Sequence, residues 1–273
     1  MTYMQKKQRG FTIIEMVIVI VVGGIIASVI AQFITRPMEG YIAQGRRAEL
    51  VDIAETALGH ISREVRLALP NSIRIACANQ CVEIIKTLDG GRYRSKPPGD
   101  ALKFTGTDSS FDTLGPLPAA DAILNKIMVI YNTGQAGANA YYGDNTATIT
   151  ARALAADGVS DNITYSSTLP GNLFPFESVQ HRFYVVETPI SFICNPGANG
   201  TIYRYDNYTI NPAQPVASPG GNSGLLASKV TSCSFEYIAG NPSRSGLLIA
   251  RITISDSGES VTLLEQVHVV NQP

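Results

Sequence analysis

An apolar run from Ile13 to Ile34 contains a single formal charge, which is the carboxylate of Glu15. The run is long enough to form a membrane-spanning helix, because about 20 apolar residues cross the hydrocarbon core of a bilayer. A carboxylate inside such a helix costs about 2.5–3.5 kcal/mol on insertion scales when it is left unpaired. The sequence therefore predicts a membrane helix whose Glu15 needs a partner.

Two ordinary interpretations of this run explain less of it. A secretory signal has an apolar region of about 7–15 residues followed by small residues at a cleavage site, whereas here Ala27, Ser28 and Ala31 come only near the far end. Cleavage after Ala31 would therefore fit the pattern poorly. A plain membrane anchor fits the length of the run, but it gives no reason for Glu15.

The residues at the start of the run resemble a known family. The segment Gly10-Phe11-Thr12-Ile13-Ile14-Glu15 follows the basic residues Lys6, Lys7 and Arg9. This pattern resembles the class III leader of type IV prepilins and of type II secretion pseudopilins. The resemblance implies that a prepilin peptidase cuts between Gly10 and Phe11 and that the new amine of Phe11 is methylated. It also implies that Glu15 meets the amine of a neighbouring subunit, which would make both charges tolerable in lipid.

Two later segments resemble one branch of this superfamily. Residues 63–74 and 263–271 are similar to the MshO family of minor pilins in the mannose-sensitive haemagglutinin (MSHA) pilus system, and more broadly to J-type pseudopilins and PilW-type minor pilins. The resemblance implies four partners: a prepilin peptidase, other minor and major pilins, an inner-membrane assembly platform and membrane lipid. The chain also departs from major pilins, which usually carry a proline within the membrane helix, because it has Gly23-Gly24 there and Pro37 only beyond it.

The distribution of charge predicts the orientation of the chain. Three basic residues precede the apolar run, so the positive-inside rule places the N-terminus in the cytoplasm and everything after about residue 35 in the periplasm, as a single-pass inner-membrane protein. The whole chain has a net charge of −1, and removal of the leader's three basic residues would leave 18 basic and 22 acidic side chains, a net charge of −4. This balance is unfavourable for nucleic acid as a main ligand.

The four cysteines fit an oxidising compartment. Four cysteines allow three pairings, and the short separation of Cys77 from Cys81 favours a local disulfide there, together with Cys194–Cys233. A four-thiolate zinc site is the alternative. Structural zinc usually shows cysteines paired at CxxC spacing, and this pattern does not. We therefore expect no metal and no cofactor.

A second helical pattern follows the apolar run. From Tyr41 to Leu69, apolar residues recur every three or four positions and charged residues occupy the other side. The pattern predicts an amphipathic helix with a break or bend at Pro37 and an end at Pro70. The expected divisions are a leader at residues 1–10, a membrane and polymerisation helix at 11–35, an amphipathic periplasmic helix at 36–70 and a β-rich globular head at 71–273.

Short extended segments separated by turn residues predict the head. The expected strands are Ser72–Ala76, Val82–Lys86, Lys126–Tyr131, Thr146–Ala151, His181–Glu187, Ile190–Cys194, Thr201–Tyr205, Val230–Tyr237, Leu247–Ser255 and Ser260–Val270. The last two flank a turn signal and should form an antiparallel hairpin. The segments 134–143 and 211–224 are expected to be loops. A long helix followed by a mostly antiparallel sheet is an α+β fold, and we expect one globular domain.

Candidate catalytic residues are few. His60, His181 and His268 are scattered, and each is expected on a helix surface or in a strand. Ser223 lies in a Gly- and Pro-rich segment, and without a demonstrable histidine and aspartate partner it is interpreted as a loop serine. We therefore predict that the protein is not an enzyme.

Three charged segments are interpreted as turns. Arg92-Tyr93-Arg94 lies between glycine and proline pairs, which favours a solvated turn over a strand that contacts nucleic acid. The acidic segments 108–112 and 256–259 lack the alternating ligand pattern of a calcium-binding loop.

These patterns favour a non-enzymatic minor pilin that helps to initiate or cap a type IV pilus, with its head at the tip. One alternative is a pilus-tip adhesin whose loops 134–143 or 211–224 contact a surface or a glycan. The other alternative is a pseudopilin of a type II secretion system.

Overall fold

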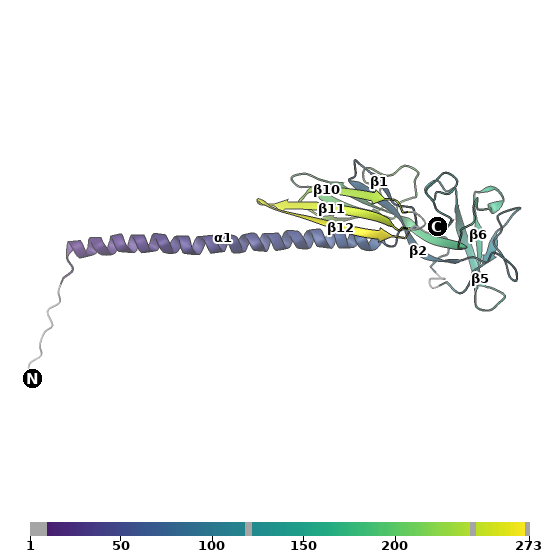
Figure 1. The fold of residues 1–273 in the computed structure, drawn as a ribbon, viewed down its shortest axis with the longest axis horizontal. Coiled ribbons are helices and arrows are strands. Elements are labelled where there is room, and N and C mark those ends of the chain that lie inside the picture. The colour runs from purple at the N-terminus through teal and green to yellow at the C-terminus, as the bar shows by residue number, and fades with distance from the viewer. Residues whose placement is uncertain (1–9, 118–121, 241–243, 271–273) are drawn as a thin grey trace, which may run out of the picture. The chain divides into compact units, whose positions relative to one another are not determined.

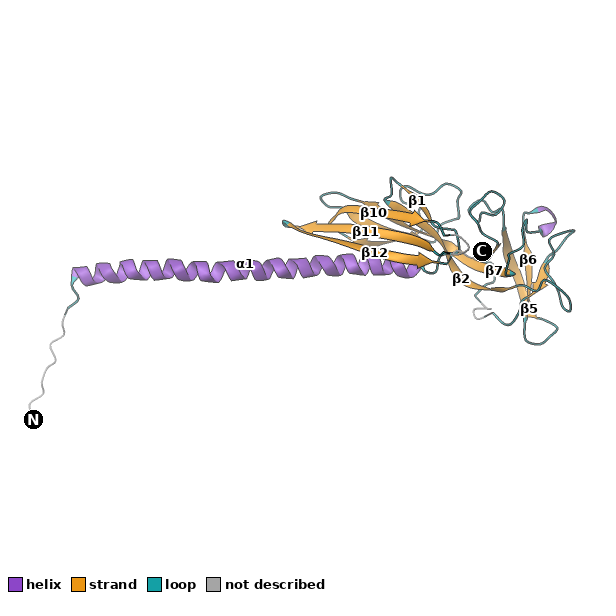
Figure 2. Cartoon of the chain, in the orientation of Figure 1, coloured by secondary structure: helices purple, strands orange, loops and turns teal. Residues whose placement is uncertain are grey.

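The computed structural model describes residues 10–117, 122–240 and 244–270, without the side chains of residues 32, 34–37 and 39. The predicted leader residues 1–9 lie outside the described residues. The chain divides into two units at residues 49 and 50, and residues 50–273 are called the C-terminal unit below. A helical segment precedes the strands in the chain, so the predicted α+β class is confirmed (Figures 1 and 2).

A single helix, α1, extends from Ile13 to Val65 and contributes to both units. Of the break or bend predicted at Pro37, a break is wrong, because α1 continues through this position. A proline removes one hydrogen bond from a helix interior, and in a helix of 53 residues the turns on both sides remain helical.

The C-terminal end of α1 also differs from the prediction. The helix ends at Val65 and does not reach Pro70. The backbone after Val65 pairs instead with a strand, because the Leu69 N–H donates to the Ile85 carbonyl at 2.7 Å and the Thr87 N–H donates to the Leu67 carbonyl at 2.8 Å. These bonds satisfy backbone groups at a helix end, and the last predicted turn of the helix becomes part of the sheet edge.

The part of α1 in the C-terminal unit buries one stripe of side chains. The stripe contains Leu50, Ala54, Ala57, Leu58, Ile61 and Val65, all almost fully buried. Their spacing of three and four residues places them on one helix face. They belong to a hydrophobic cluster that also contains side chains of three strands, beside which this part of α1 lies (Figure 1). These strands are β10 (Val230–Ile238), β11 (Gly246–Asp256) and β12 (Glu259–Val269). The predicted amphipathic pattern is therefore confirmed for these residues.

The strands form two sheets whose pairings are all antiparallel. The larger, nine-stranded sheet has the order β1 (Arg74–Ala76), β2 (Cys81–Arg92), β7 (Arg182–Asn195), β4 (Ile127–Ile130), β5 (Thr146–Leu154), β6 (Asp161–Ser166) and β3 (Ser110–Asp112), with β8 (Thr201–Asp206) beside β7 and β9 (Asn222–Ala227) beside β8. The smaller sheet has the order β10 (Val230–Ile238), β11 (Gly246–Asp256) and β12 (Glu259–Val269). A 3-10 turn, η1, spans Pro170–Asn172.

Most predicted strands are present, and four predictions need correction. The two strands expected at 181–187 and 190–194 are one strand, β7, because Pro189 remains paired with Ile85 of β2. The predicted loop at 211–224 ends early, since β9 begins at Asn222 and includes Ser223. The acidic segment 108–112 is not a turn throughout, because its last three residues form β3. The strand β6 was not predicted. The hairpin of β11 and β12 is confirmed, with Asp256 opposite Glu259.

Aromatic side chains fill a second hydrophobic cluster in the C-terminal unit. Tyr93, Phe111 and Phe183 are fully buried there, and the rings of Phe111 and Phe183 meet edge to face with centroids 5.3 Å apart. The prediction of a solvated turn at Tyr93 is therefore wrong. The backbone of Tyr93 forms an antiparallel bridge to Thr113, and this pairing continues the strand far enough to place the ring in the cluster. Burial raises the pKa of the Tyr93 hydroxyl to about 12.

Two disulfides lie close to the junction of the two sheets. Cys77 is bonded to Cys81 across the β1–β2 turn, and Cys194 of β7 is bonded to Cys233 of β10. These are the two pairs that the sequence favoured. The β1–β2 turn also accepts backbone bonds from both sheets: the Gln80 carbonyl from the Cys194 N–H at 3.0 Å and the Asn79 carbonyl from the Phe235 N–H at 2.7 Å.

Candidate functional site

The predicted processing position lies immediately before α1. Gly10 and Phe11 are exposed and outside regular structure, and a Cβ built on Gly10 would meet no heavy atom within 4 Å. Exposed backbone outside regular structure is the form that proteases cut most readily, because it is free to enter a cleft. The geometry around Gly10–Phe11 is therefore compatible with cleavage at the predicted bond.

A reciprocal pair of hydrogen bonds begins α1. The Glu15 N–H donates to the Thr12 hydroxyl at 3.3 Å, and the Thr12 N–H donates to the Glu15 carboxylate at 3.4 Å. This arrangement is a capping box, in which two otherwise unpaired N–H groups of a helix N-terminus are satisfied. A carboxylate at this end is also favoured by the helix dipole. Glu15 thus has one partner within its own chain, which the sequence interpretation missed although the spacing Thr-x-x-Glu was its signal.

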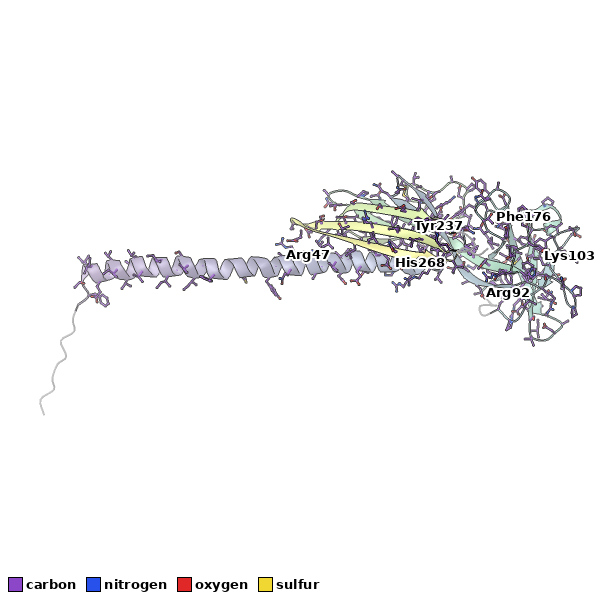
Figure 3. All side chains as sticks on the ribbon, in the orientation of Figure 1. Arg47, Arg92, Lys103, Phe176, Tyr237 and His268 are labelled. Atoms are coloured by element: carbon purple, nitrogen blue, oxygen red, sulfur yellow. A yellow bond between two sulfur atoms is a disulfide. The ribbon has the colours of Figure 1, made fainter. Side chains whose placement is uncertain are left out.

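The first part of α1 has the properties of a membrane span. Residues Ile13–Ala31 form a helical segment of 19 residues that is long and apolar enough to cross a bilayer, and none of it is buried within the chain. Its large apolar side chains project around the helix and are at least about half exposed (Figure 3). Such a surface requires lipid or other protein around it, because contiguous exposed apolar area of this size is rare on soluble monomers. The segment fits a single-pass membrane anchor.

The residues considered for catalysis do not converge. His60 lies on the exposed face of α1. His268 is exposed on β12 (Figure 3). His181 lies just before β7, with its ring 5.4 Å from the ring of Tyr93. Ser223 is an exposed residue of β9. Within the described ranges, no group of three or more His, Cys, Asp or Glu side chains is arranged to hold a metal ion.

A buried charge network is the strongest electrostatic feature of the C-terminal unit. The fully buried carboxylate of Glu83 forms an ion pair with Arg74 and accepts a 2.8 Å hydrogen bond from the Tyr208 hydroxyl. Burial raises the pKa of Glu83, and the two hydrogen bonds and the charge of Arg74 oppose this rise. Arg74 also donates to the carbonyls of Asn211 and Pro212, at 2.8 and 2.7 Å. The network therefore holds the segment after Tyr208 against β1 and β2, which is a structural role.

Comparison with known families gives a match at the N-terminal end of the chain. Residues 5–31 match the family described as the prokaryotic N-terminal methylation motif. The chain carries this methylation motif. The matched segment includes Gly10, Phe11 and Glu15 and covers the start of the exposed apolar helix, and it supports a type IV pilin-like protein or pseudopilin. No curated protein and no solved structure matches the chain.

The predicted site residues fall into two separate groups, one at the start of the chain and one in the C-terminal unit. Gly10, Phe11 and Glu15 lie within one short segment, and the methylation motif covers all three. The four cysteines form their two bonds in the C-terminal unit and belong to its stability.

Proposed function

We propose that this protein is a minor pilin of an MSHA-type type IV pilus, similar to the MshO family, and that it helps to initiate or cap pilus assembly without enzymatic activity. The observation that carries the proposal is the methylation motif at residues 5–31, which coincides with an apolar helix that no described part of its own chain buries. A helix of this kind is used when subunits pack through their N-terminal helices.

In this proposal, a prepilin peptidase cuts between Gly10 and Phe11 and the amine of Phe11 is methylated. The leader remains on the cytoplasmic side and the C-terminal unit lies in the periplasm. The mature chain joins other minor and major pilins at the inner-membrane assembly platform through the helix at residues 11–35. The size of the head favours a place at the pilus tip, because a bulky domain is easier to accommodate there than along the shaft.

Glu15 is the group that would select and align a neighbouring subunit. Its carboxylate is satisfied within the chain by the N–H of Thr12 at 3.4 Å, a long hydrogen bond. The positively charged amine of a neighbouring processed chain is a better partner, because it adds the attraction between two opposite full charges, which is strong where water is excluded. The exchange of one partner for the other would therefore favour assembly and fix the register of adjacent helices.

The experiment is a count of surface pili by electron microscopy in an in-frame deletion strain complemented with variants. We expect the deletion to remove pili, and wild type and Glu55→Ala to restore them, whereas Glu15→Ala should not. Glu55 is a suitable control because it is an exposed carboxylate of α1 outside the membrane segment. An unchanged number of pili in the deletion strain would contradict a role in initiation.

A secretion pseudopilin is the second candidate, because the methylation motif occurs in pilins and pseudopilins alike. The same strains distinguish the two. Failure of protein export with normal pili would favour the pseudopilin, and loss of adhesion with normal pili would favour a tip adhesin.

A further inference from the structure

The turn that joins β1 to β2 has a left-handed backbone. Three consecutive residues other than glycine have positive φ angles, which are 55° at Cys77, 51° at Ala78 and 70° at Asn79. In this region the Cβ atom of a residue comes too close to the following carbonyl oxygen, and only glycine and to some extent asparagine adopt it readily. Such residues normally occur singly, so three in succession strain the backbone and require surroundings that hold them in place.

Two kinds of bond hold this turn. The disulfide between Cys77 and Cys81 closes it over four positions and is called the turn disulfide below. Carbonyl oxygens within the turn also accept backbone hydrogen bonds from both sheets, because the N–H of Cys194 in β7 and the N–H of Phe235 in β10 donate to them. The turn is therefore a strained segment and, at the same time, a connection between the two sheets.

The second disulfide of the chain lies in different surroundings. Cys194 and Cys233, which form the strand disulfide, are only 2% and 7% exposed, and each belongs to a strand. Cys77 of the turn disulfide is only partly buried and lies outside the strands. Reduction of the strand disulfide would leave its two thiols side by side, because the strands keep them there, whereas reduction of the turn disulfide would let strained backbone relax. Strained or accessible disulfides are the ones that reduce most easily.

We propose that the turn disulfide is a redox-sensitive switch that controls the connection between the two sheets. A dithiol reduces it in two exchange steps. In the first step, a thiolate of the dithiol attacks Sγ of Cys77, a mixed disulfide forms, and Cys81 leaves as a thiolate that takes up a proton. In the second step, the other thiol of the dithiol attacks the mixed disulfide as its thiolate and releases Cys77 as a thiol. Two electrons pass to the cysteines, and the dithiol becomes a cyclic disulfide.

Reduction loosens the junction of the sheets without separating them. The reduced turn is free to leave the left-handed region, and the carbonyls that accept from Cys194 and Phe235 move with it. The strand disulfide and other backbone bonds still connect the sheets, such as the bond from the Val230 N–H to the Gly200 carbonyl at 3.0 Å. The inference does not depend on the assembly role, because it concerns the C-terminal unit alone.

The test uses the full chain in lipid nanodiscs, equilibrated with mixtures of reduced and oxidised dithiothreitol. Alkylation of free thiols and peptide mapping measure the reduction of each disulfide. The turn disulfide should be half reduced at a ratio of reduced to oxidised reagent about tenfold or more below that required by the strand disulfide. Ala78→Gly should raise the ratio for the turn disulfide about threefold or more, because glycine adopts positive φ without strain. Ala198→Gly, at an exposed alanine of the β7–β8 turn without positive φ, should not change it.

Amide hydrogen exchange measures the connection between the sheets. In protein reduced only at the turn disulfide, the N–H groups of Cys194 and Phe235 should exchange about tenfold or more faster than in oxidised protein, and the N–H of Val230 should exchange at its former rate. The proposal is overturned if the strand disulfide is reduced at the same ratio or a lower one, or if Ala78→Gly and Ala198→Gly behave alike. It is also overturned if exchange at Cys194 and Phe235 increases no more than exchange at Val230.

Discussion

The two ends of α1 have the same backbone structure and opposite surroundings. Residues 13–31 are apolar except for Glu15 and Ser28 and are not buried, whereas residues 50–65 bury a stripe of side chains against strands of the C-terminal unit. Most helical stability in proteins comes from packing of such a stripe. The second part is therefore stabilised from within its own chain, and the first part depends on lipid or on other subunits. This difference indicates which part of α1 is held by its own chain and which part needs surroundings from outside it.

The largest contrast should appear when one isoleucine is shortened in each part. Ile61→Ala removes a fully buried side chain and should lower the free energy of unfolding by about 2–5 kcal/mol. Ile20→Ala, at an exposed position, should change it by less than about 0.5 kcal/mol. The measurement is denaturant unfolding of the full chain in micelles, followed by circular dichroism. Equal losses in the two variants would contradict the division of α1 into two parts.

The disulfides provide the next test of internal stabilisation. Cys194 and Cys233 are 39 positions apart and Cys77 and Cys81 only four. A disulfide that closes a longer loop restricts the unfolded chain more. Replacing both cysteines with alanine should therefore lower the free energy of unfolding by roughly 4 kcal/mol for the first pair and by roughly 2 kcal/mol for the second. Unfolding of the two double variants under oxidising conditions measures the difference. A larger loss of stability in the variant without Cys77–Cys81 would contradict this order. It would show that packing at the β1–β2 turn of the folded state outweighs the loop entropy of the unfolded state.

A smaller effect is expected at the start of the exposed part. Thr12→Ala removes the hydroxyl that caps the Glu15 N–H and should weaken the first turn by about 1 kcal/mol. Faster amide hydrogen exchange at Ile14, Glu15 and Met16 in micelles would record this. Ser28→Ala is the control, because its hydroxyl donates to the Ile25 carbonyl in the middle of the helix and caps no helix end. Identical exchange in Thr12→Ala and wild type would show that the capping box does not hold in micelles.

The smallest effect concerns pH. Burial raises the pKa of Glu83 in the folded state above its ordinary value of 4.5. The folded chain therefore binds a proton more readily than the unfolded chain, and this group's contribution to stability declines as pH rises from about 4.5 through the raised pKa. Glu83→Gln should remove that part of the pH dependence. The measurement is the free energy of unfolding in urea between pH 4.5 and pH 8. If this free energy changed with pH equally in wild type and in Glu83→Gln, the prediction would be contradicted.

The sequence was sufficient for features that are local. The motif from Gly10 to Glu15 is contiguous, the stripe at residues 50–65 repeats with the helix period, and the β11–β12 hairpin has its own turn signal. Each of these patterns is decided by residues within a few positions of one another.

Features that depend on distant pairing could not be read in this way. The strands β3, β6 and β9 are short, and each is fixed by hydrogen bonds to a neighbouring strand. Tyr93 follows two glycines and an arginine, so its sequence indicates a turn, and only pairing with Thr113 buries it. Likewise, the β2–β7 register places Arg92 opposite Arg182, although the two residues are 90 positions apart in the chain.

The bond between Cys194 and Cys233 also determines how the C-terminal unit would respond to tension. A fibre that pulls on its subunits stretches each chain along its contour. The segment between the two cysteines would extend by roughly 130 Å if it were released, at about 3.3–3.6 Å per residue. The covalent bond removes this length from the extensible chain and transmits force directly from β7 to β10. A force applied between the two sheets would thus be carried by this covalent bond as well as by the hydrogen bonds between strands.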